Sequence, residues 1–228
     1  MPNWCSANYM FYAETDIGKK NLRALWKKLY RVFNTKGACT GVKSVIKRMG
    51  VKEKVLLDIG SDLRDEIHDV QDSIVKTEDN WHFEVQAELA WNDYYATRAF
   101  HFLITHFYSG VKMSFIAEEC GEEYYVKHDD KNFYRDKYIV DISGTNVPTE
   151  GTTYLQSKEG LISYVEEFGV QGLDEKATLR EIECKLMEEL VTQAEDRGDS
   201  ATDIYVHVHE FDEVSYAKDY GVEDVEAA

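Results

Sequence analysis

The stretch MPNWCSANYMFYAE, residues 1–14, decides which fold we expect for this chain. Within it Tyr9 and Phe11 alternate with Met10 and Tyr12, so a strand formed here would carry large side chains on both faces. Strands of this kind are covered by other elements on both sides of their sheet. We therefore predict that the segment forms a central strand of a protein with both helices and strands.

Trp4 lies where chains usually fray unless packing holds them in place. Burial of one large apolar side chain stabilises a fold by about 1.5–3 kcal/mol, which is enough to order a terminus. We predict that Trp4 is mostly buried against the first domain. Two functional alternatives remain open: Trp4 contributes to a binding surface, or the amine of Pro2 acts as a base after Met1 is removed.

Helical periodicity follows the strand. Residues 19–34 carry an apolar stripe, and either Thr15 or Asp16 can cap the helix that this stripe predicts. Lysines occupy its remaining faces, so we expect an amphipathic helix with a basic outer face. Residues 41–50 predict a shorter basic helix that a glycine ends. The stripe of the first helix consists of Leu22, Leu25, Trp26, Leu29, Tyr30 and Phe33.

The middle of the chain combines strands with one further helix. Residues 58–80 are acid-rich and weakly periodic, so we expect a loop or a marginal element there. Residues 81–91 alternate as a strand does, and residues 94–108 have helical spacing although many of them are aromatic or β-branched. Residues 144–151 contain proline and two glycines and predict a linker. Before this linker we predict a meander of three strands, at residues 111–119, 122–129 and 132–143.

The part beyond the linker has a different pattern. Residues 157–169 and 174–198 predict two helices, and residues 202–214 predict a closing strand that can return to the main sheet. Residues 217–228 are acidic, and we expect a flexible tail there.

The net charge of −17 is unevenly divided along the chain. Residues 1–57 hold 12 lysines and arginines against 3 acidic residues, and the remainder holds 14 against 40. Such an acidic body repels phosphates at long range and attracts basic protein surfaces. No stretch approaches the roughly 18 apolar residues of a membrane span, and the first 20 residues lack the apolar centre of a signal peptide. We expect a cytoplasmic protein, in a bacterium or an infected host, without a membrane partner.

The sequence disfavours several common kinds of chemistry. Its four cysteines are widely separated, so neither a zinc site nor a disulfide framework is indicated. Motifs for a phosphate-binding loop, a dinucleotide fold or a nucleophile elbow are absent from the sequence. We therefore predict no cofactor and no catalytic residues.

Two parts of the sequence carry a family resemblance. The opening MPNWCSA resembles the MPNWCSN start of a family of phage, plasmid and other mobile-element proteins, and FEVQAELAW with VKMSFIAEECGEEYYV resembles later parts of the same family. The likeness covers roughly residues 1–140. Ala7 stands where the family usually has asparagine, and the residues after Trp91 lack its Ser-Pro-Pro. The resemblance implies a ferredoxin-like β-α-β-β-α-β domain and an origin in mobile DNA, and it implies no activity.

Together these observations predict an α+β protein. We expect a ferredoxin-like antiparallel sheet with packed helices at residues 1–142. A helical extension with a closing strand follows at residues 152–216, and the flexible tail at residues 217–228.

The leading functional hypothesis is a non-enzymatic module that binds a protein. Its acidic surface would engage a basic partner encoded by the host or by the element, and such a partner can itself be a DNA-binding protein. The residues expected at this surface are Trp4, Trp91, Glu118, Glu119, Glu122 and Glu123.

A second hypothesis is binding of nucleic acid. Lys20, Lys27 and Lys28 on the basic helix would contact phosphates, and aromatic side chains of the sheet would stack on bases. The acidic body opposes this binding at long range.

A third hypothesis is a metal-dependent hydrolase that uses paired carboxylates or the histidines of the closing strand. His207 and His209 lie two residues apart and so share a face, and Glu210 or Asp212 is a conceivable third ligand. Two ligands alone bind a metal weakly, and we predict that no metal binds to His207 and His209.

Overall fold

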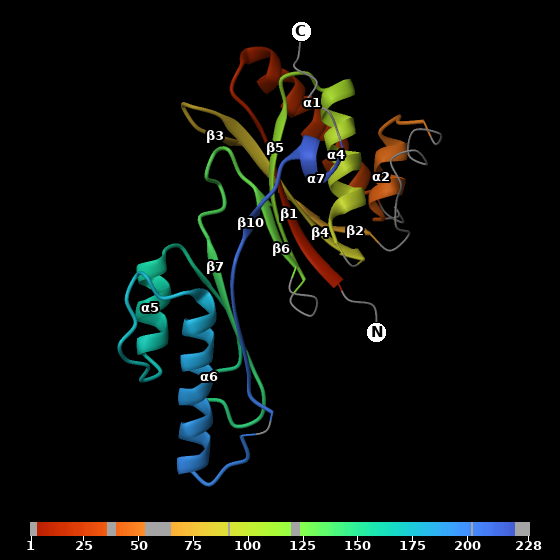
Figure 1. Ribbon diagram of the computed structural model, residues 1–228. Coiled ribbons are helices and arrows are strands. Elements are labelled where there is room, and N and C mark those ends of the chain that lie inside the picture. The colour runs from red at the N-terminus through yellow and green to blue at the C-terminus, as the bar shows by residue number, and fades with distance from the viewer. Residues whose placement is uncertain are drawn as a thin grey trace. The chain divides into compact units, whose positions relative to one another are not determined.

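The computed structural model describes residues 4–35, 40–52, 65–90, 92–119, 124–201 and 203–221. The chain divides into two compact units (Figure 1). Unit 1 comprises Met1–Tyr134 and Asp212–Ala228, and unit 2 comprises Arg135–Phe211. Both units combine helices with strands, so the protein is α+β, as predicted.

Unit 1 contains a seven-stranded sheet within the described residues. The strand order is β10-β6-β5-β1-β4-β2, and β3 also pairs with β4. All pairings are antiparallel except that of β10 with β6, which makes the sheet mixed. The strands are β1 (Trp4–Ala13), β2 (Glu66–Val70), β3 (Val75–Lys76), β4 (Trp81–Ala90), β5 (Lys112–Glu119), β6 (Tyr124–His128) and β10 (Asp212–Glu213).

The opening stretch is the central strand that its alternation predicts. β1 pairs with β4 along its whole length and with β5 from Ser6 onward. The core face of β1 carries four fully or almost fully buried residues, Cys5, Ala7, Tyr9 and Phe11. The rings of Tyr9 and Phe11 pack against aromatic side chains of neighbouring elements. Phe11 is stacked on Phe83, with 5.3 Å between the ring centroids. This aromatic layer is the centre of the hydrophobic core of unit 1.

Four helices belong to unit 1 in the described residues: α1 (Asp16–Phe33), α2 (Val42–Arg48), α4 (Tyr94–Phe107) and the short α7 (Tyr216–Asp219). Thr15 caps α1, since its hydroxyl accepts a hydrogen bond from the backbone N–H of Gly18, which confirms one of the two predicted caps. The apolar stripe of α1 faces the core, where Leu22, Leu25 and Leu29 are fully buried. The lysines and arginines of α1 are left on its outer side.

Unit 2 is a three-stranded antiparallel sheet covered by two helices (Figure 1). The strand order is β8-β7-β9, so β9 has a strand partner on one side only. Leu186 and Leu190 of α6 are buried with Val206 and Val208 of β9 in a separate core. The elements are β7 (Tyr138–Ser143), β8 (Gly151–Leu155), α5 (Lys158–Glu166), α6 (Leu179–Asp196) and β9 (Tyr205–Glu210).

The division of the chain differs from the predicted boundary at residue 142. The third strand of the expected meander is β7, and it pairs with β8 and β9 of unit 2 rather than with β6. Residues 217–221 are also not a loose tail, because Tyr220 is only 2 % exposed and lies in the core of unit 1. Residues 222–228 lie outside the described residues.

Residues 58–80, expected to be a loop or a marginal element, contain two short strands in the part that the structure describes. Glu66–Val70 and Val75–Lys76 form β2 and β3, both paired with β4. The register of β2 shifts between Ile67 and Asp69. This irregularity breaks the period of two that identifies a strand in a sequence.

Among the described residues no helix is both long and apolar enough to cross a bilayer.

Gly144 follows β7 with a φ of +136°, and a Cβ at this position would lie 1.9 Å from the carbonyl oxygen of Asp203. We expect Gly144→Ala to lower the free energy of unfolding of unit 2 by about 2–3 kcal/mol, because both the φ angle and the contact oppose a side chain. Gly151→Ala is the matched control, since its φ is +130° but no atom lies within 4 Å. Chemical denaturation measures both variants, and equal losses would show that the contact contributes nothing.

Candidate functional site

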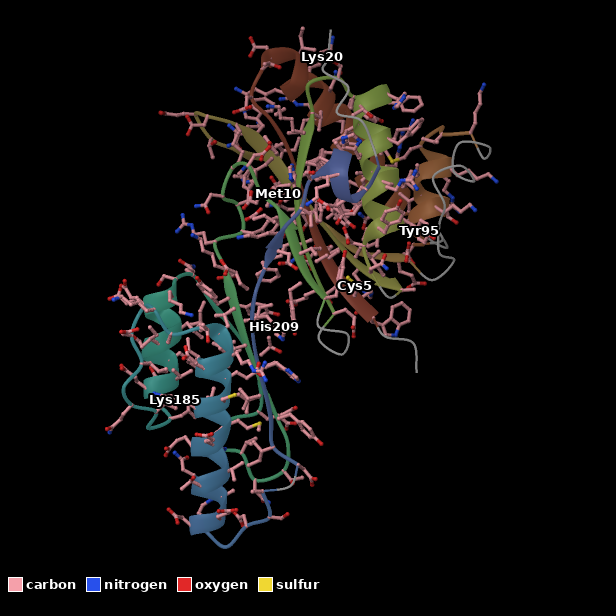
Figure 2. The ribbon with its side chains drawn as sticks, viewed as in Figure 1. Cys5, Met10, Lys20, Tyr95, Lys185 and His209 are labelled. Carbon is pink, nitrogen blue, oxygen red and sulfur yellow. The ribbon has the colours of Figure 1, made fainter. Side chains whose placement is uncertain are left out.

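A row of basic side chains lies on the exposed side of α1. Lys20, Arg23, Lys27 and Arg31 are all exposed, and their spacing of three and four residues places them along one face of the helix. Figure 2 labels Lys20 near the N-terminal end of this row. The only acidic residue of α1 is Asp16, in its first turn. We call these four residues the basic row.

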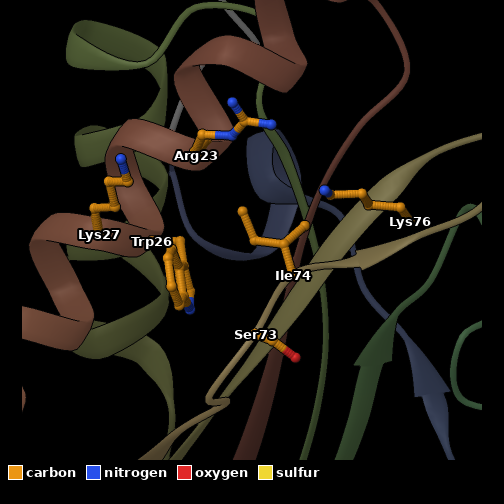
Figure 3. A pocket seen from close by; sticks show the side chains of 6 residues that line it. All are labelled: Arg23, Trp26, Lys27, Ser73, Ile74 and Lys76. Carbon is orange, nitrogen blue, oxygen red and sulfur yellow. The ribbon is translucent and has the colours of Figure 1, made fainter.

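A shallow hollow of about 350 Å³ lies between α1 and the segment that leads into β3. Figure 3 shows the helix contributing three of its side chains and the residues around β3 contributing the other three. Three of the six are cations, and none is a carboxylate. The lining residues of this basic hollow are Arg23, Trp26, Lys27, Ser73, Ile74 and Lys76.

The indole of Trp26 is held in place at the base of the basic hollow. Its Nε1–H donates a hydrogen bond of 2.9 Å to the carbonyl oxygen of Gln71. Its ring stacks on Tyr30, with 5.4 Å between ring centroids. The Tyr30 hydroxyl in turn donates to Asp72, and this hydrogen bond raises the pKa of Tyr30. Gln71 and Tyr30 therefore hold the indole directly, and Asp72 holds Tyr30, before any ligand binds.

Two of the cations share a second aromatic ring, that of Trp81 on β4. The guanidinium carbon of Arg23 lies 5.1 Å from the centre of this ring, and the ammonium nitrogen of Lys76 lies 5.0 Å from it. Cation–π attraction at these distances keeps both charges close to the Trp81 ring. The two cations thus come from different elements and converge on one hollow.

Only part of the predicted lysine set takes part in this arrangement. Lys20 and Lys27 are exposed on the basic row, as the nucleic-acid hypothesis requires. The ammonium group of Lys28 instead donates a hydrogen bond of 2.6 Å to the carbonyl oxygen of Met49 and ties α1 to the end of α2. Lys76 is missing from the predicted set because nothing in the sequence shows that β3 lies beside α1. Arg23 is also missing, although its spacing from Lys20 and Lys27 places it on the same helix face.

The prediction that Trp4 is mostly buried is wrong, since 44 % of its surface is exposed. The core face of β1 carries Cys5, Ala7, Tyr9 and Phe11, so Trp4 shares the opposite face with Ser6 and Asn8. Its backbone pairs with Ala90 but not with β5, because the pairing of β1 with β5 begins at Ser6. The ring therefore lies at a corner of the sheet where few side chains can cover it.

The predicted acidic surface is not assembled within the described residues. Glu119 is only 6 % exposed, and Glu118 is partly buried beside it on β5. Burial raises the pKa of the Cys5 thiol, and Asp93 and Glu119 raise it further. The remaining members of the predicted set, Trp91, Glu122 and Glu123, lie outside the described residues.

A buried carboxylate, absent from every prediction, connects three elements of unit 1. Asp93 accepts hydrogen bonds from the hydroxyls of Thr97, Tyr124 and Tyr220, at 2.5, 2.5 and 2.8 Å. Thr97 also hydrogen bonds with the hydroxyl of Tyr9 at 3.1 Å. Asp93 is fully buried, and this desolvation raises its pKa, although the three hydroxyl donors act in the opposite direction. Because no solvent reaches the carboxylate, its role is to hold the C-terminal segment in unit 1.

Unit 2 brings the two predicted histidines together with a third residue. His207 and His209 lie on the same face of β9, with 5.9 Å between ring centroids. Glu183 of α6 lies beside them. The predicted third ligands do not join them, because Asp212 belongs to unit 1 and Glu210 is absent from the cluster.

Comparisons of the chain with models of protein families, with curated proteins and with solved structures gave no match. The resemblance to the MPNWCSN-type family therefore stays a prediction from the sequence.

Proposed function

We propose that unit 1 is a ferredoxin-like domain of a non-enzymatic module that binds single-stranded nucleic acid through the basic hollow. The observation that carries this proposal is that Arg23, Lys27 and Lys76 line one hollow together with the fixed ring of Trp26, without a carboxylate in the lining. Cations bind phosphates, and an aromatic ring stacks on an unpaired base. The six lining residues include no histidine, cysteine or acidic group, which favours binding over catalysis.

The ferredoxin-like part of the proposal is supported by topology. The inner strands run β5-β1-β4-β2, and all three of their pairings are antiparallel. The connection from β1 to β2 contains α1, and that from β4 to β5 contains α4. This is the β-α-β-β-α-β order of the fold, with α2 and β3 as additions. An origin in a phage or another mobile element is proposed on the sequence resemblance alone.

The shape of the site favours a single strand over a duplex. Bases of a duplex are stacked on one another, so an aromatic ring in a shallow hollow reaches only unpaired bases. The basic row extends beyond the hollow over about 16 Å of helix at 1.5 Å per residue. A strand that places one base against Trp26 can therefore lay neighbouring phosphates along Lys20 and Arg31.

The acidic remainder of the chain limits the range of this attraction. With a net charge of −17, the protein as a whole repels a polyanion. At physiological salt this repulsion is screened beyond about 8 Å, so contacts at the hollow act locally. The rival hypothesis of a basic protein partner remains a prediction. Of the residues that it names and the structure describes, Glu119 is buried, Glu118 is partly buried and Trp4 is exposed.

The proposal predicts that reversing two charges of the hollow weakens binding. We expect Arg23→Glu with Lys27→Glu to lower the affinity for a fluorescein-labelled oligothymidylate by about 10- to 100-fold. The slope of log K against log salt should shrink by roughly 0.7 for each lost phosphate contact. Fluorescence anisotropy at several salt concentrations measures both quantities.

The matched control reverses two exposed cations of unit 2, Lys176→Glu with Arg180→Glu, and so changes the net charge equally. This control should retain the salt slope of the natural protein. Equal weakening in both double variants would show that only overall charge matters and would contradict the proposal. A further variant, Trp26→Leu, should weaken binding without changing the slope, because it removes stacking and no charge.

A further inference from the structure

A second site, unrelated to the basic hollow, lies at the edge of the unit 2 sheet. β9 pairs with β7 on one side, and no strand of the described part of the chain pairs with its other side. Val206 and Val208 face the core formed with α6, so His207 and His209 share the opposite face. Their rings are stacked, with an angle of 29° between them.

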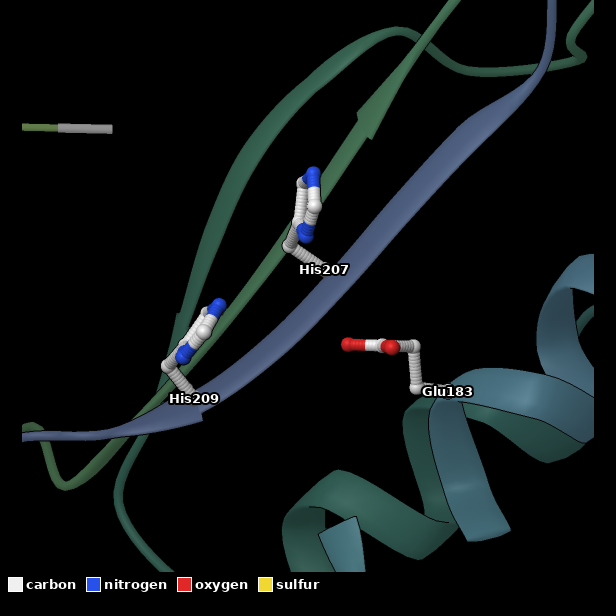
Figure 4. Close-up of side chains that lie close together, drawn as sticks. All are labelled: Glu183, His207 and His209. Carbon is white, nitrogen blue, oxygen red and sulfur yellow. The ribbon is translucent and has the colours of Figure 1, made fainter. Parts of the chain in front are cut away.

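Glu183 approaches these histidines from α6. It follows the fully buried Ile182, which anchors this turn of the helix in the core of unit 2. Its Oε2 accepts a hydrogen bond of 3.0 Å from the backbone N–H of Val208, the residue between the two histidines. Figure 4 shows the carboxylate extending from α6 toward β9. The carboxylate thus lies at the backbone of β9, where one ligand atom of each imidazole is within 4.8 Å of it although both rings are on the sheet face opposite the α6 core.

The three side chains are close enough to share one metal ion. One ligand atom from each lies within 4.8 Å of the others, and all three residues are half-buried. Ligand atoms around a tetrahedral zinc ion, with bonds of about 2.0–2.1 Å, are roughly 3.4 Å apart. Binding of one ion therefore requires the three side chains to move closer together than they are here.

We propose that Glu183, His207 and His209 form a binding site for Zn²⁺. Two imidazole nitrogens and one carboxylate oxygen suit zinc, whereas magnesium and calcium favour sites made of oxygen atoms. Three protein ligands leave a fourth position that water can occupy. The hydrogen bond from Val208 orients the carboxylate, as partners outside the ligand set commonly do.

Asp141 supports the same assignment from the neighbouring strand. It is directly opposite His207 in the pairing of β7 with β9, so the two side chains lie on one face. Its Oδ1 accepts a hydrogen bond of 2.8 Å from the hydroxyl of Thr152. A carboxylate beside a ligand histidine commonly orients the imidazole and raises its basicity. The sequence alone predicts that His207 and His209 bind no metal. That prediction rests on the two histidines without a ligand from α6, and the proposal replaces it.

The alternative is that Glu183 only satisfies a backbone N–H at the open edge of β9. Glu183→Gln separates the two roles, because the amide oxygen of glutamine can still accept from Val208 but binds zinc poorly. His207→Ala removes a second ligand on a different element. His68→Ala is the matched control: the imidazole of His68 lies 3.0 Å from the half-exposed carboxylate of Glu88 in unit 1, but among the described residues no third ligand accompanies this pair.

The experiment is calorimetric titration of the full chain with ZnCl₂. The protein carries no histidine tag, and Cys184→Ser is present throughout because this exposed thiol could bind zinc itself. We expect one ion per chain with a dissociation constant on the order of 1 μM or tighter. Circular dichroism first establishes that each variant is folded, and the absorption spectrum with Co²⁺ reports tetrahedral coordination.

In His207→Ala and Glu183→Gln we expect affinity for zinc to fall by about 100-fold or more, since loss of an outer partner alone costs roughly 10- to 100-fold. His68→Ala should bind as the parent does. Absence of saturable binding in the parent would overturn the proposal, as would unchanged affinity in Glu183→Gln. If His207→Ala fails to fold, Glu183→Gln decides the question alone.

Discussion

Asp93→Ala is expected to lower the free energy of unfolding of unit 1 by about 3–5 kcal/mol. The substitution removes the acceptor of three hydroxyl groups, those of Thr97, Tyr124 and Tyr220. Each buried hydroxyl left without a partner costs about 1–3 kcal/mol, and water entering the space recovers part of this. Urea denaturation followed by circular dichroism measures the loss.

The control for Asp93 is Asp72→Ala. Asp72 also accepts a hydrogen bond from a tyrosine hydroxyl, that of Tyr30, but this pair is exposed to water. Its removal should leave the unfolding midpoint nearly unchanged, because water replaces the lost partner. A loss at Asp93 no larger than that at Asp72 would show that the buried network contributes little to stability.

Asp93 also predicts how stability depends on pH. Burial raises the pKa of Asp93 above its ordinary value of 3.8. The stability that protonated Asp93 contributes is therefore complete below pH 3.8. It declines as the pH rises through the pKa that Asp93 has in the folded protein. Asp93→Asn cannot ionise, so the stability of the natural protein relative to this variant should fall as the pH is raised from 4. Denaturation at a series of pH values measures this difference, and a constant difference would contradict the raised pKa.

Tyr216→Ala together with Tyr220→Ala should lower the free energy of unfolding of unit 1 still further, by about 6–10 kcal/mol, because loss of each buried ring costs about 3–5 kcal/mol. Both rings lie in the core of unit 1, and the Tyr216 hydroxyl donates a hydrogen bond of 2.6 Å to Met113. Domains of this size are stable by only about 5–15 kcal/mol, so unit 1 should be largely unfolded. Hydrogen exchange should show the loss in β1 and β5 while β7 and β9 keep their protection.

The corresponding double phenylalanine variant separates the rings from their hydroxyls. It keeps the aromatic packing and removes only the hydrogen bonds to Met113 and Asp93. We expect the double phenylalanine variant to lower the free energy of unfolding by about a few kcal/mol at most and to leave unit 1 folded. Unfolding of this variant, or full protection of β1 in the double alanine variant, would contradict the roles assigned to the rings.

Local periodicity explains which parts of the fold are predictable. The alternation in β1 and the apolar stripe of α1 each identify an element and its buried side, because the pattern depends on neighbouring residues alone. The same alternation places Trp4 on the face of Ser6 and Asn8, opposite Tyr9. Parity alone does not predict the exposure of Trp4, because Tyr12 on the same face is buried. The exposure follows from the pairing of β1 with β5, which begins only at Ser6.

Long-range pairing explains what the sequence does not reveal. β7 has the alternation of a strand, but its pattern does not specify whether it joins β6 or β8. The basic hollow needs Lys76 beside Arg23, and the zinc site needs Glu183 beside β9. Each pair depends on how separate elements pack. Residues at such junctions carry no periodic signal that sets them apart from other surface charges.

The position of unit 2 within the chain has a consequence for synthesis on the ribosome. Residues 135–211 leave the exit tunnel before residues 212–221, which supply β10, α7 and two core tyrosines to unit 1. Nascent domains normally fold in the order in which they emerge. Here the order is reversed, because the sequence of unit 2 is complete before that of unit 1. Until β10 is synthesised, the outer side of β6 in the sheet of unit 1 is uncovered. A pause in translation between these segments would prolong the exposure of that edge to other nascent chains.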